Sequence, residues 1–455
     1  MSDFMNEASD FLANNPDVET IDCIIPDLCG VIRGKRIARD GLEKIYKSGF
    51  QIPASSVLLD VRGDTDDPNG RGVSDGDPDI TARPVAGTLV TVPWFEKPMA
   101  QLLVSFYEED GSPHYFDPRH VLQRVLDRFS AMGLRPVVAL EQEFYLLDPE
   151  GGLEGKPKPP ILPATGRRAS GTQVLSISDL EGFGLFLDQV TQSCKIQKIP
   201  VGPVTSEYAT GQYEINLIHT DDPLAACDHA MLLPRVVKGV ARSHGVDATF
   251  MAKPYSHQSG SGMHMHVSLL DEKGNNVFSG GDETGNEMLH HAIGGLLGTM
   301  ADAMAFFAPN INSFRRFRLG TYVPVSRSWG ANNRSVAVRI PAGEDANRRL
   351  EHRIAGADAN PYLALTAVLA GMHHGISKKI SPPAATGIDA TPDVDNSLPK
   401  KWHRALDVLA GSDVMAEYFG EEYRNIYVTC KRDEMESFMS EPSPREYEWY
   451  LRPEG

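Results

Sequence analysis

Four segments in the middle of the chain alternate apolar and polar residues with a period of two. They are residues 137–148, 211–217, 260–270 and 350–354. Successive side chains of a β-strand point to opposite faces, so this spacing predicts four strands. In the first segment Leu140 and Phe144 share the apolar face, while Glu141 and Glu143 share the polar one. A half-exposed strand gives the same pattern, but four polar faces rich in carboxylates, imidazoles and guanidiniums favour one site where they converge.

Apolar residues spaced three and four positions apart predict helices between these strands. The clearest cover residues 116–133, 228–245, 286–307 and 360–376. Asp117 and Pro118 provide the N-terminal signals of the first helix. The residues before it predict mostly short strands, with one helix near residues 40–48. We therefore expect an α+β protein with an N-terminal domain over residues 1–113 and a second domain over residues 114–455.

The composition narrows the classes of partner. The chain has 455 residues with 44 Lys and Arg against 61 Asp and Glu, a formal net charge of −17. Proteins that bind nucleic acids need a basic surface, so this net negative charge argues against a nucleic-acid-binding protein. No run approaches about 18 apolar residues, the start lacks a signal-peptide pattern, and the five cysteines form no C-x-x-C pair. We expect a cytoplasmic protein with no membrane segment and no disulfide framework.

The polar faces carry the residues of a divalent-metal site. Five glutamates and one histidine lie on or beside the predicted strands: Glu141, Glu143, Glu207, Glu214, Glu351 and His264. Carboxylate-rich sites with a single imidazole suit Mg²⁺ or Mn²⁺ better than structural Zn²⁺. If the strands converge, these side chains line a funnel that holds metal ions.

Arginines supply the complementary charge. Eight of them fall in residues 312–320, 332–343 and 347–353. Arginine binds carboxylates and phosphates through paired N–H donors. Beside acidic metal ligands, this indicates nucleotide phosphate chemistry. The chain contains no GxxxxGK[ST], and the glycines at 260 and 262 precede a strand, so the phosphates are not held by a P-loop.

Five longer motifs follow one another across residues 139–363. They read ALEQEFYLL, EYATGQYEINL, GSGMHMHVS, NNRSVAVRIP and RRLEHRIAGADANPYL. In these motifs the chain resembles the glutamine synthetase family, and FMAKPYSHQ and RRFRLGTYVPVSRSWG make it most similar to the gamma-glutamylputrescine (polyamine) synthetase branch. The resemblance implies a β-grasp-like N-terminal domain and a catalytic domain whose antiparallel sheet forms a funnel-shaped site flanked by helices. It also implies a homo-oligomer of hexameric rings, which can stack as a dodecamer.

The same resemblance assigns roles to single residues. One metal, nearer glutamate, would be held by Glu143, Glu207 and Glu214. A second metal, nearer the phosphates of ATP, would be held by Glu141, His264 and Glu351. The positions that match ATP contacts are His266, Ser268, Arg339 and Arg349. Those that match glutamate contacts are Gly260, Arg316 and Arg353, while Arg334 matches the arginine of the transferred phosphoryl group. Arg334, Arg316 and Glu207 are expected to act in catalysis.

The implied reaction is an ATP-dependent ligation of the glutamate γ-carboxylate to an amine through γ-glutamyl phosphate. Ammonia-using members hold ammonium with two acids, and Pro53 and Tyr322 stand at those positions here. An ammonium ion without a counter-charge is costly to desolvate. We therefore expect a larger primary amine, putrescine or another polyamine, in amine catabolism. A monoamine and ammonia stay open as alternatives, and intact ligand positions disfavour a catalytically silent homologue.

The surroundings of the amine are less determined. Candidates for the group that deprotonates it are Glu207, Glu214, Asp60 and Asp64. Trp329 could contact the amine or pack in the core. The resemblance implies that the loop over residues 50–80 enters a neighbouring subunit's site. The acids of that loop expected near a diamine's distal ammonium are Asp64, Asp66 and Asp67.

Overall fold

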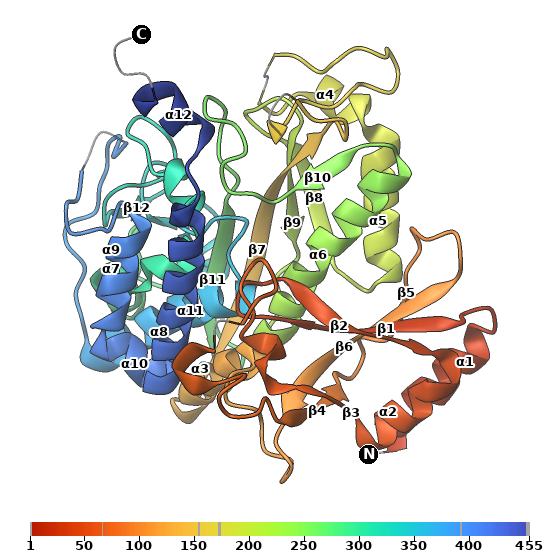
Figure 1. Ribbon diagram of the computed structural model, residues 1–455. Helices are drawn as coiled ribbons and strands as arrows, with labels where there is room; N and C mark the ends of the chain where they lie inside the picture. The colour runs from red at the N-terminus through yellow and green to blue at the C-terminus, as the bar shows by residue number, and fades with distance from the viewer. Residues whose placement is uncertain (1, 66, 153–154, 172–173, 392–393, 452–455) are drawn as a thin grey trace.

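Two β-sheets, formed one after the other along the chain, organise the molecule (Figure 1). The computed structural model describes residues 2–65, 67–152, 155–171, 174–391 and 394–451. Among these residues no helix is long and apolar enough to cross a membrane. All five cysteines are free and buried, which confirms the absence of a disulfide framework.

The first sheet has six strands in the order β2-β1-β6-β4-β3, with β5 paired to β6. The strands are β1 (Thr20–Pro26), β2 (Ile32–Ala38), β3 (Phe50–Pro53), β4 (Asp79–Pro84), β5 (Val90–Thr91) and β6 (Met99–Tyr107). Strands β1 and β6 run parallel. The expected helix is α2 (Leu42–Ser48), but α1 (Ser2–Asn14) was not predicted. The apolar residues Ala8, Phe11 and Leu12 of α1 are spaced three and four positions apart and pack on the core, so the helical pattern is present in the sequence.

The second sheet has eight strands in the order β12-β13-β14-β11-β7-β9-β8, with β10 paired to β7. The strands are β7 (Leu134–Leu147), β8 (Val201–Ser206), β9 (Gln212–Leu217), β10 (Asp247–Thr249), β11 (Met263–Asp271), β12 (Trp329–Ala331), β13 (Val338–Ile340) and β14 (Leu350–His352). Neighbouring strands are antiparallel except for β12 and β13. Leu140 and Phe144 of β7 are fully buried, as the alternation predicts. The four predicted strands are confirmed as β7, β9, β11 and β14.

Helices flank this second sheet. They are α3 (Pro118–Ala131), α4 (Ile177–Gly182), α5 (Gly184–Ile196), α6 (Pro223–Ser243), α7 (Glu287–Phe307), α8 (Pro361–Lys378), α9 (Trp402–Ala410), α10 (Asp413–Phe419), α11 (Glu421–Ser440) and α12 (Pro444–Tyr450). In Figure 1, α5 and α6 lie to the right of β7, and α7 to α11 lie to its left. The predicted cap is present, because the Asp117 side chain accepts from the Arg119 amide at 2.9 Å. Of these helices, α3, α6, α7 and α8 were predicted.

One hydrophobic core extends through both sheets and the helices. It includes Ile24 of β1, Val121 of α3, Phe144 of β7 and Leu365 of α8. Because the core is continuous, burial alone does not divide the chain. The domain boundary at residue 113 stays a prediction, while the α+β class is confirmed.

Helices α7 and α8 pack backbone against backbone through glycines. A Cβ atom on Gly295 of α7 would lie 2.1 Å from the carbonyl oxygen of Gly371 of α8. A Cβ on Gly375 would lie 2.1 Å from the carbonyl oxygen of His291. No side chain fits at this crossing, so glycine is required there for close approach.

Candidate active site

The strand register brings the predicted polar residues together on one face of the second sheet. Glu141 of β7 lies opposite His264 of β11, and Glu143 lies opposite Glu214 of β9. On the other side of β11, His266 lies opposite Glu351 of β14. Directly opposed side chains on neighbouring strands are about 5 Å apart at Cβ. The convergence inferred from the period-two pattern is therefore present.

Glu141 lies at the centre of this face. Its carboxylate oxygens are 3.3 Å from His264 Nδ1 and 2.9 Å from His266 Nε2. His264 Nδ1 is also 3.9 Å from a carboxylate oxygen of Glu351. The far ring nitrogen of His266, Nδ1, lies 3.2 Å from Arg349 Nε. The Glu141 carboxylate therefore joins β7 to β11, and His264 extends the contacts to Glu351 of β14.

Glu351 is the most buried acid of the face, with 1% of its surface exposed. Arg339 of β13 donates to one carboxylate oxygen at 2.8 Å, and Arg353 donates to the other. Burial alone would raise the pKa of Glu351, but the charges of Arg353 and His264 lower it to about 2. The carboxylate is therefore ionised and available as a ligand.

Glu143 lies beside Arg316 and the segment Gly260–Gly262. It accepts hydrogen bonds from the Gly262 amide at 2.9 Å and from Gln212 Nε2 at 3.2 Å. Arg316 is 3% exposed and donates to the Ile354 carbonyl oxygen at 2.9 Å. A Cβ on Gly262 would lie 3.0 Å from Arg316 Nη2, so the missing side chain leaves room for the guanidinium.

A like-charge cluster perturbs the carboxyl groups of this face. Burial, together with the charge of Glu207, raises the pKa of Glu143 to about 8. Burial and the charges of Glu141 and Glu143 raise the pKa of Glu214 to about 9. Burial also raises the pKa of Glu207. Burial would raise the pKa of Glu141 as well, but the hydrogen bonds to its two histidines lower it instead. A divalent cation among these acids would offset their mutual repulsion.

The donor set fits such a cation. Ligand atoms of Glu141, His266 and Glu351 all lie within 4.8 Å of one another, and so do those of Glu141, Glu214 and His264. Two ligands on opposite sides of Mg²⁺ are about 4.2 Å apart, so a small contraction would complete either group. The amide oxygens of Gln212 and Asn216 are buried nearby with no hydrogen-bond partner among the described residues. Oxygen ligands with one imidazole match Mg²⁺ or Mn²⁺.

The arginines present unused donors to the same region. The Nε–H groups of Arg316, Arg339 and Arg353 are buried, and none has a hydrogen-bond partner in the part of the chain that the structure describes. An unpaired buried donor costs free energy until a ligand accepts from it. Three such donors beside the acidic cluster indicate that the complete site contains anionic substrate groups.

The remaining predicted site residues are Arg334, Ser268 and Gly260. Arg334 is exposed on the turn between β12 and β13, where its charge acts on Glu207. Ser268 continues the polar face of β11 two residues beyond His266. The carbonyl oxygen of Gly260 accepts a hydrogen bond from Gln212 Nε2 at 3.1 Å.

Two aromatic positions differ in exposure. Trp329 is 4% exposed, and its Nε1 donates to the Pro383 carbonyl oxygen at 2.7 Å. Of the two roles considered for Trp329, contact with the amine and packing in the core, the structure therefore shows packing in the core. Tyr322 is 64% exposed and is free to face solvent or a neighbouring molecule. Asp60 is 2% exposed and accepts from Arg62 Nε at 2.7 Å, while Asp66 lies outside the described residues.

The sequence interpretation missed Asp358 as a member of the site. Its Oδ2 accepts from Asn310 at 2.8 Å and from Ser313 at 2.7 Å, and its Oδ1 is buried with no partner among the described residues. Burial raises the pKa of Asp358. A Cβ on Gly356 would lie 2.4 Å from Asp358 Oδ1 and 3.4 Å from Arg316 Nη1. Its position in the motif AGADANPYL was the only available signal, since no strand alternation covers it.

Comparison with known families accounts for this arrangement of acids and arginines. A sequence model described as glutamine synthetase, catalytic domain, matches residues 115–450. The chain belongs to the glutamine synthetase family. The expectation of a carbon–nitrogen ligase is confirmed by this membership. Glutamine synthetase family ligases use ATP and divalent metal ions.

Similar glutamine synthetase family proteins match the chain over nearly its whole length. Gamma-glutamylputrescine synthetase PuuA of Escherichia coli (strain K12) is 39% identical over 99% of this chain and 95% of its own. Glutamate–isopropylamine ligase of a Pseudomonas species is 32% identical over 93% of this chain and 92% of its own. The solved structure "Apo GmaS without ligand" superimposes with a TM-score of 0.84 at 27% identity, covering 98% of this chain and 99% of that one. The expected glutamine synthetase fold is confirmed.

Proposed function

We propose that this protein joins the γ-carboxylate of glutamate to a primary amine, putrescine or another polyamine, while ATP is converted to ADP and phosphate. The observation that carries the proposal is the polar face on which Glu141, Glu143 and Glu351 lie beside the unpaired donors of Arg316 and Arg353. Similar proteins are named for putrescine and isopropylamine, which are both larger than ammonia.

The arginines bind and orient the two acidic substrates. Arg316 and Arg353 hold the carboxylates of glutamate through buried N–H donors, and Gly260 lies against Arg316 at the same position. Arg339 and Arg349, with His266 and Ser268, hold ATP, since Arg349 and His266 already contact each other. Fixing both substrates in this way supplies much of the rate enhancement.

The reaction then takes two steps. The γ-carboxylate oxygen attacks the γ-phosphorus of ATP, the bond to ADP breaks, and γ-glutamyl phosphate forms. The neutral amine attacks the acyl carbon, phosphate leaves, and the amine proton passes to a base. Arg334 stabilises the charge on the transferred phosphoryl group. Glu207, which interacts electrostatically with Arg334, also takes part in catalysis.

The carboxylates of this face would hold two divalent metal ions. From the family's motifs we assign Glu143, Glu207 and Glu214 to the ion nearer glutamate, and Glu141, His264 and Glu351 to the ion nearer ATP. The ligand atoms that already converge form two other groups, Glu141 with His266 and Glu351, and Glu141 with Glu214 and His264. Such ions neutralise phosphate oxygens and lower the charge repulsion between the two anionic substrates. Mg²⁺ or Mn²⁺ suits the oxygen-rich donor set.

The choice of amine rests on Pro53 and Tyr322, the two positions where ammonia-using relatives have acids. Pro53 ends β3, and the exposed Tyr322 lies in the loop before β12, so neither supplies a carboxylate for ammonium. An apolar or aromatic surface suits the methylene chain of a larger amine.

Phosphate release, measured with ATP, glutamate and Mg²⁺, tests the proposal. Ammonia, ethylamine, putrescine and spermidine are each added in turn. We expect kcat/KM for putrescine or spermidine to exceed that for ammonia by about tenfold or more, equivalent to about 1.4 kcal/mol of selective binding. A preference for ammonia would refute the enlarged amine pocket, and no turnover with any amine would favour a silent homologue.

A matched pair of variants tests the metal assignment. Glu143→Gln should abolish turnover, whereas Glu283→Gln, an exposed acid in a loop outside the site, should leave it unchanged. Both variants should retain the circular dichroism spectrum of the wild type. Turnover by Glu143→Gln within about tenfold of wild type would contradict the assignment.

Further parts of the proposal concern the whole protein. We infer a catalytic domain over residues 114–455 and an N-terminal domain over residues 1–113 that completes a neighbouring subunit's site in a hexameric or dodecameric ring. We also infer that the protein acts in the cytoplasm, which agrees with its free cysteines.

A further inference from the structure

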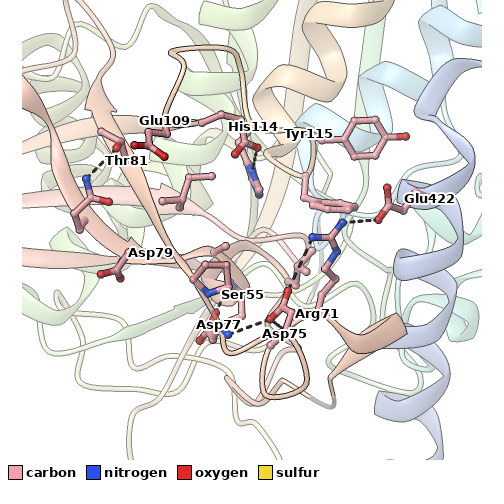
Figure 2. A pocket seen from close by; sticks show the side chains of 18 residues that line it. Ser55, Arg71, Asp75, Asp77, Asp79, Thr81, Glu109, His114, Tyr115 and Glu422 are labelled. Carbon is pink, nitrogen blue, oxygen red and sulfur yellow. Dashed lines mark hydrogen bonds and ion pairs between the residues drawn. The ribbon is translucent and has the colours of Figure 1, made fainter.

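A cavity of about 520 Å³ lies outside the polar face of the second sheet (Figure 2). Its walls include His114, Glu422 of α11 and residues of the loop before β4, among them Ser55 and Asp77. The loop over residues 50–80 is the one expected to enter a neighbouring subunit's site. We therefore expect this cavity to face the neighbouring subunit, whereas the acid described next lies beside the reaction site of its own chain.

Asp358 is a buried acid beside the candidate active site that has no role in the proposed reaction. It lies in the segment between β14 and α8. Its Oδ2 accepts hydrogen bonds from Asn310 Nδ2 at 2.8 Å and from Ser313 Oγ at 2.7 Å. Ser313 is fully buried and begins the 3₁₀ turn Ser313–Arg316, which ends at the arginine assigned to glutamate. One carboxylate oxygen therefore holds the turn that carries Arg316.

Asn310 extends this anchor to the backbone of the turn. Its Oδ1 accepts hydrogen bonds from the amides of Asn312 and Ser313 at 2.9 and 3.1 Å, while its Nδ2 donates to Asp358. The contacts of Asp358 thus reach both the hydroxyl and, through Asn310, the amide of Ser313. Hydrogen bonds to an ionised acceptor are stronger than neutral ones, so the carboxylate is the strongest element of this anchor.

The charge of Asp358 also acts on Arg316. Arg316 is 3% exposed and makes no ion pair with any residue that the structure describes. Burial lowers the pKa of Arg316, and the charges of Glu143 and Asp358 oppose that effect. In return, the charge of Arg316 and the hydrogen bonds from Ser313 and Asn310 favour the ionised form of Asp358 against its burial. Because Glu143 is assigned to a metal ion, Asp358 is the acid left to balance the guanidinium.

Gly356 leaves open the space between the two groups. A Cβ atom at this position would lie 2.4 Å from Asp358 Oδ1 and 3.4 Å from Arg316 Nη1. The Gly356 amide donates to the Phe307 carbonyl oxygen at 2.9 Å, which holds the backbone in place. Only glycine allows the carboxylate and the guanidinium to approach the same point of the chain.

We propose that Asp358 is a positioning residue for glutamate, which holds the turn Ser313–Arg316 so that the Arg316 guanidinium meets the substrate carboxylate. The inference rests on the proposed function, because it requires that Arg316 binds glutamate. The Asp358 carboxylate faces Asn310, Ser313 and Gly356, so it acts through Arg316 and not by contact with glutamate. Loss of its charge should weaken glutamate binding and spare ATP binding, which is assigned to other arginines.

Steady-state kinetics with putrescine, in which glutamate and ATP are varied in turn, test the proposal. Asp358→Asn keeps the shape and removes the charge, and we expect KM for glutamate to rise about tenfold or more while KM for ATP stays within about twofold. Ser313→Ala removes one anchor and should raise KM for glutamate about threefold. The control is Asp228→Asn, a buried acid of α6 held by Arg119 and Tyr362, which should leave both KM values within about twofold.

A double variant separates positioning from a merely structural role. If Asp358 acts through the guanidinium, adding Asp358→Asn to Arg316→Lys should change KM for glutamate by less than about twofold. A further tenfold rise in the double variant would overturn the proposal, and so would an unchanged KM for glutamate in Asp358→Asn. Should Asp358→Asn fail to fold, a raised KM for glutamate in Ser313→Ala supports the proposal and an unchanged one refutes it.

Calorimetry of glutamate binding, with Mg²⁺ and ADP present, separates this inference from the proposed function. A wild type that binds glutamate but turns over no amine would sink the proposed function, and about tenfold weaker binding by Asp358→Asn would still support the positioning role. A wild type that turns over putrescine, with equal glutamate affinity in Asp358→Asn, would leave the function standing and refute the role of Asp358.

Discussion

A buried ion pair ties the first sheet to helix α11. Lys431 is 1% exposed, and its Nζ donates to Glu434 Oε2 at 2.8 Å and to Cys29 Sγ at 3.0 Å. Burial raises the pKa of the Cys29 thiol to about 12, so the thiol is neutral and Glu434 supplies the opposing charge. Cys29 follows β1, so one ammonium group links residues 402 positions apart.

Replacing this lysine should destabilise the protein strongly. Lys431→Met keeps most of the volume but leaves the Glu434 carboxylate, 6% exposed, without its cation. At 2.8 Å and an effective dielectric constant of about 20, the lost attraction is about 6 kcal/mol. Relaxation and protonation of the stranded acid reduce this, so we expect about 3–5 kcal/mol, the usual cost of breaking a buried pair.

Urea unfolding at fixed protein concentration, followed by tryptophan fluorescence, measures the loss. Lys44→Met, at an exposed position of α2, is the control and should change stability by less than about 0.5 kcal/mol. Adding Glu434→Leu to Lys431→Met removes the stranded charge and should restore most of the loss. A loss under about 1 kcal/mol for Lys431→Met, or a double variant less stable than the single one, would refute the reasoning.

Three further predictions concern packing, acid stability and metal binding. Gly295→Ala should cost about 3 kcal/mol or more in urea unfolding, because its methyl group would meet the Gly371 carbonyl oxygen; a loss under about 0.5 kcal/mol would contradict the packing. Burial alone would raise the pKa of Asp395, but hydrogen bonds from Ser397 and Arg327 lower it to about 2. The resulting stabilisation is present above the pKa of Asp395 in the unfolded chain and is lost as the pH falls toward 2. Asp395→Asn should therefore make the melting temperature fall less steeply below pH 4. An unchanged dependence on pH would contradict this prediction. Mg²⁺ should raise the melting temperature of the wild type more than that of Glu214→Gln, and equal shifts would argue against Glu214 as a ligand.

Period-two alternation was sufficient for the polar strands because burial on one face determines the register. It predicted that Glu141 and Glu143 face the same way, and the pairing with His264 and Glu214 agrees. The pattern could not show which strands are neighbours, since β7 lies between β9 and β11 although β9 precedes β11 by many residues. The strand order is known only from the structure.

Contacts between distant segments left no local signal. The pair of Cys29 with Lys431, and the cavity between His114 and Glu422, depend on how the first sheet packs against α11. Alternation also could not separate a surface tryptophan from a packed one, and Trp329 is packed. Helix α1 was not predicted, although Ala8, Phe11 and Leu12 follow the helical spacing.

Site residues and core residues alternate along the same strands, so an error in strand pairing affects both. Glu141 and His264 face each other because Leu140 and Met265, one step away, pair in the core. A slip of one residue between β7 and β11 would put carboxylates into the core and apolar side chains into the funnel. Such a chain would lose its stability and its site together, so misfolded material cannot contribute partial activity. Specific activity per mass of total protein is then a direct measure of correct strand pairing, and preparations that differ in this activity should differ in the fraction folded.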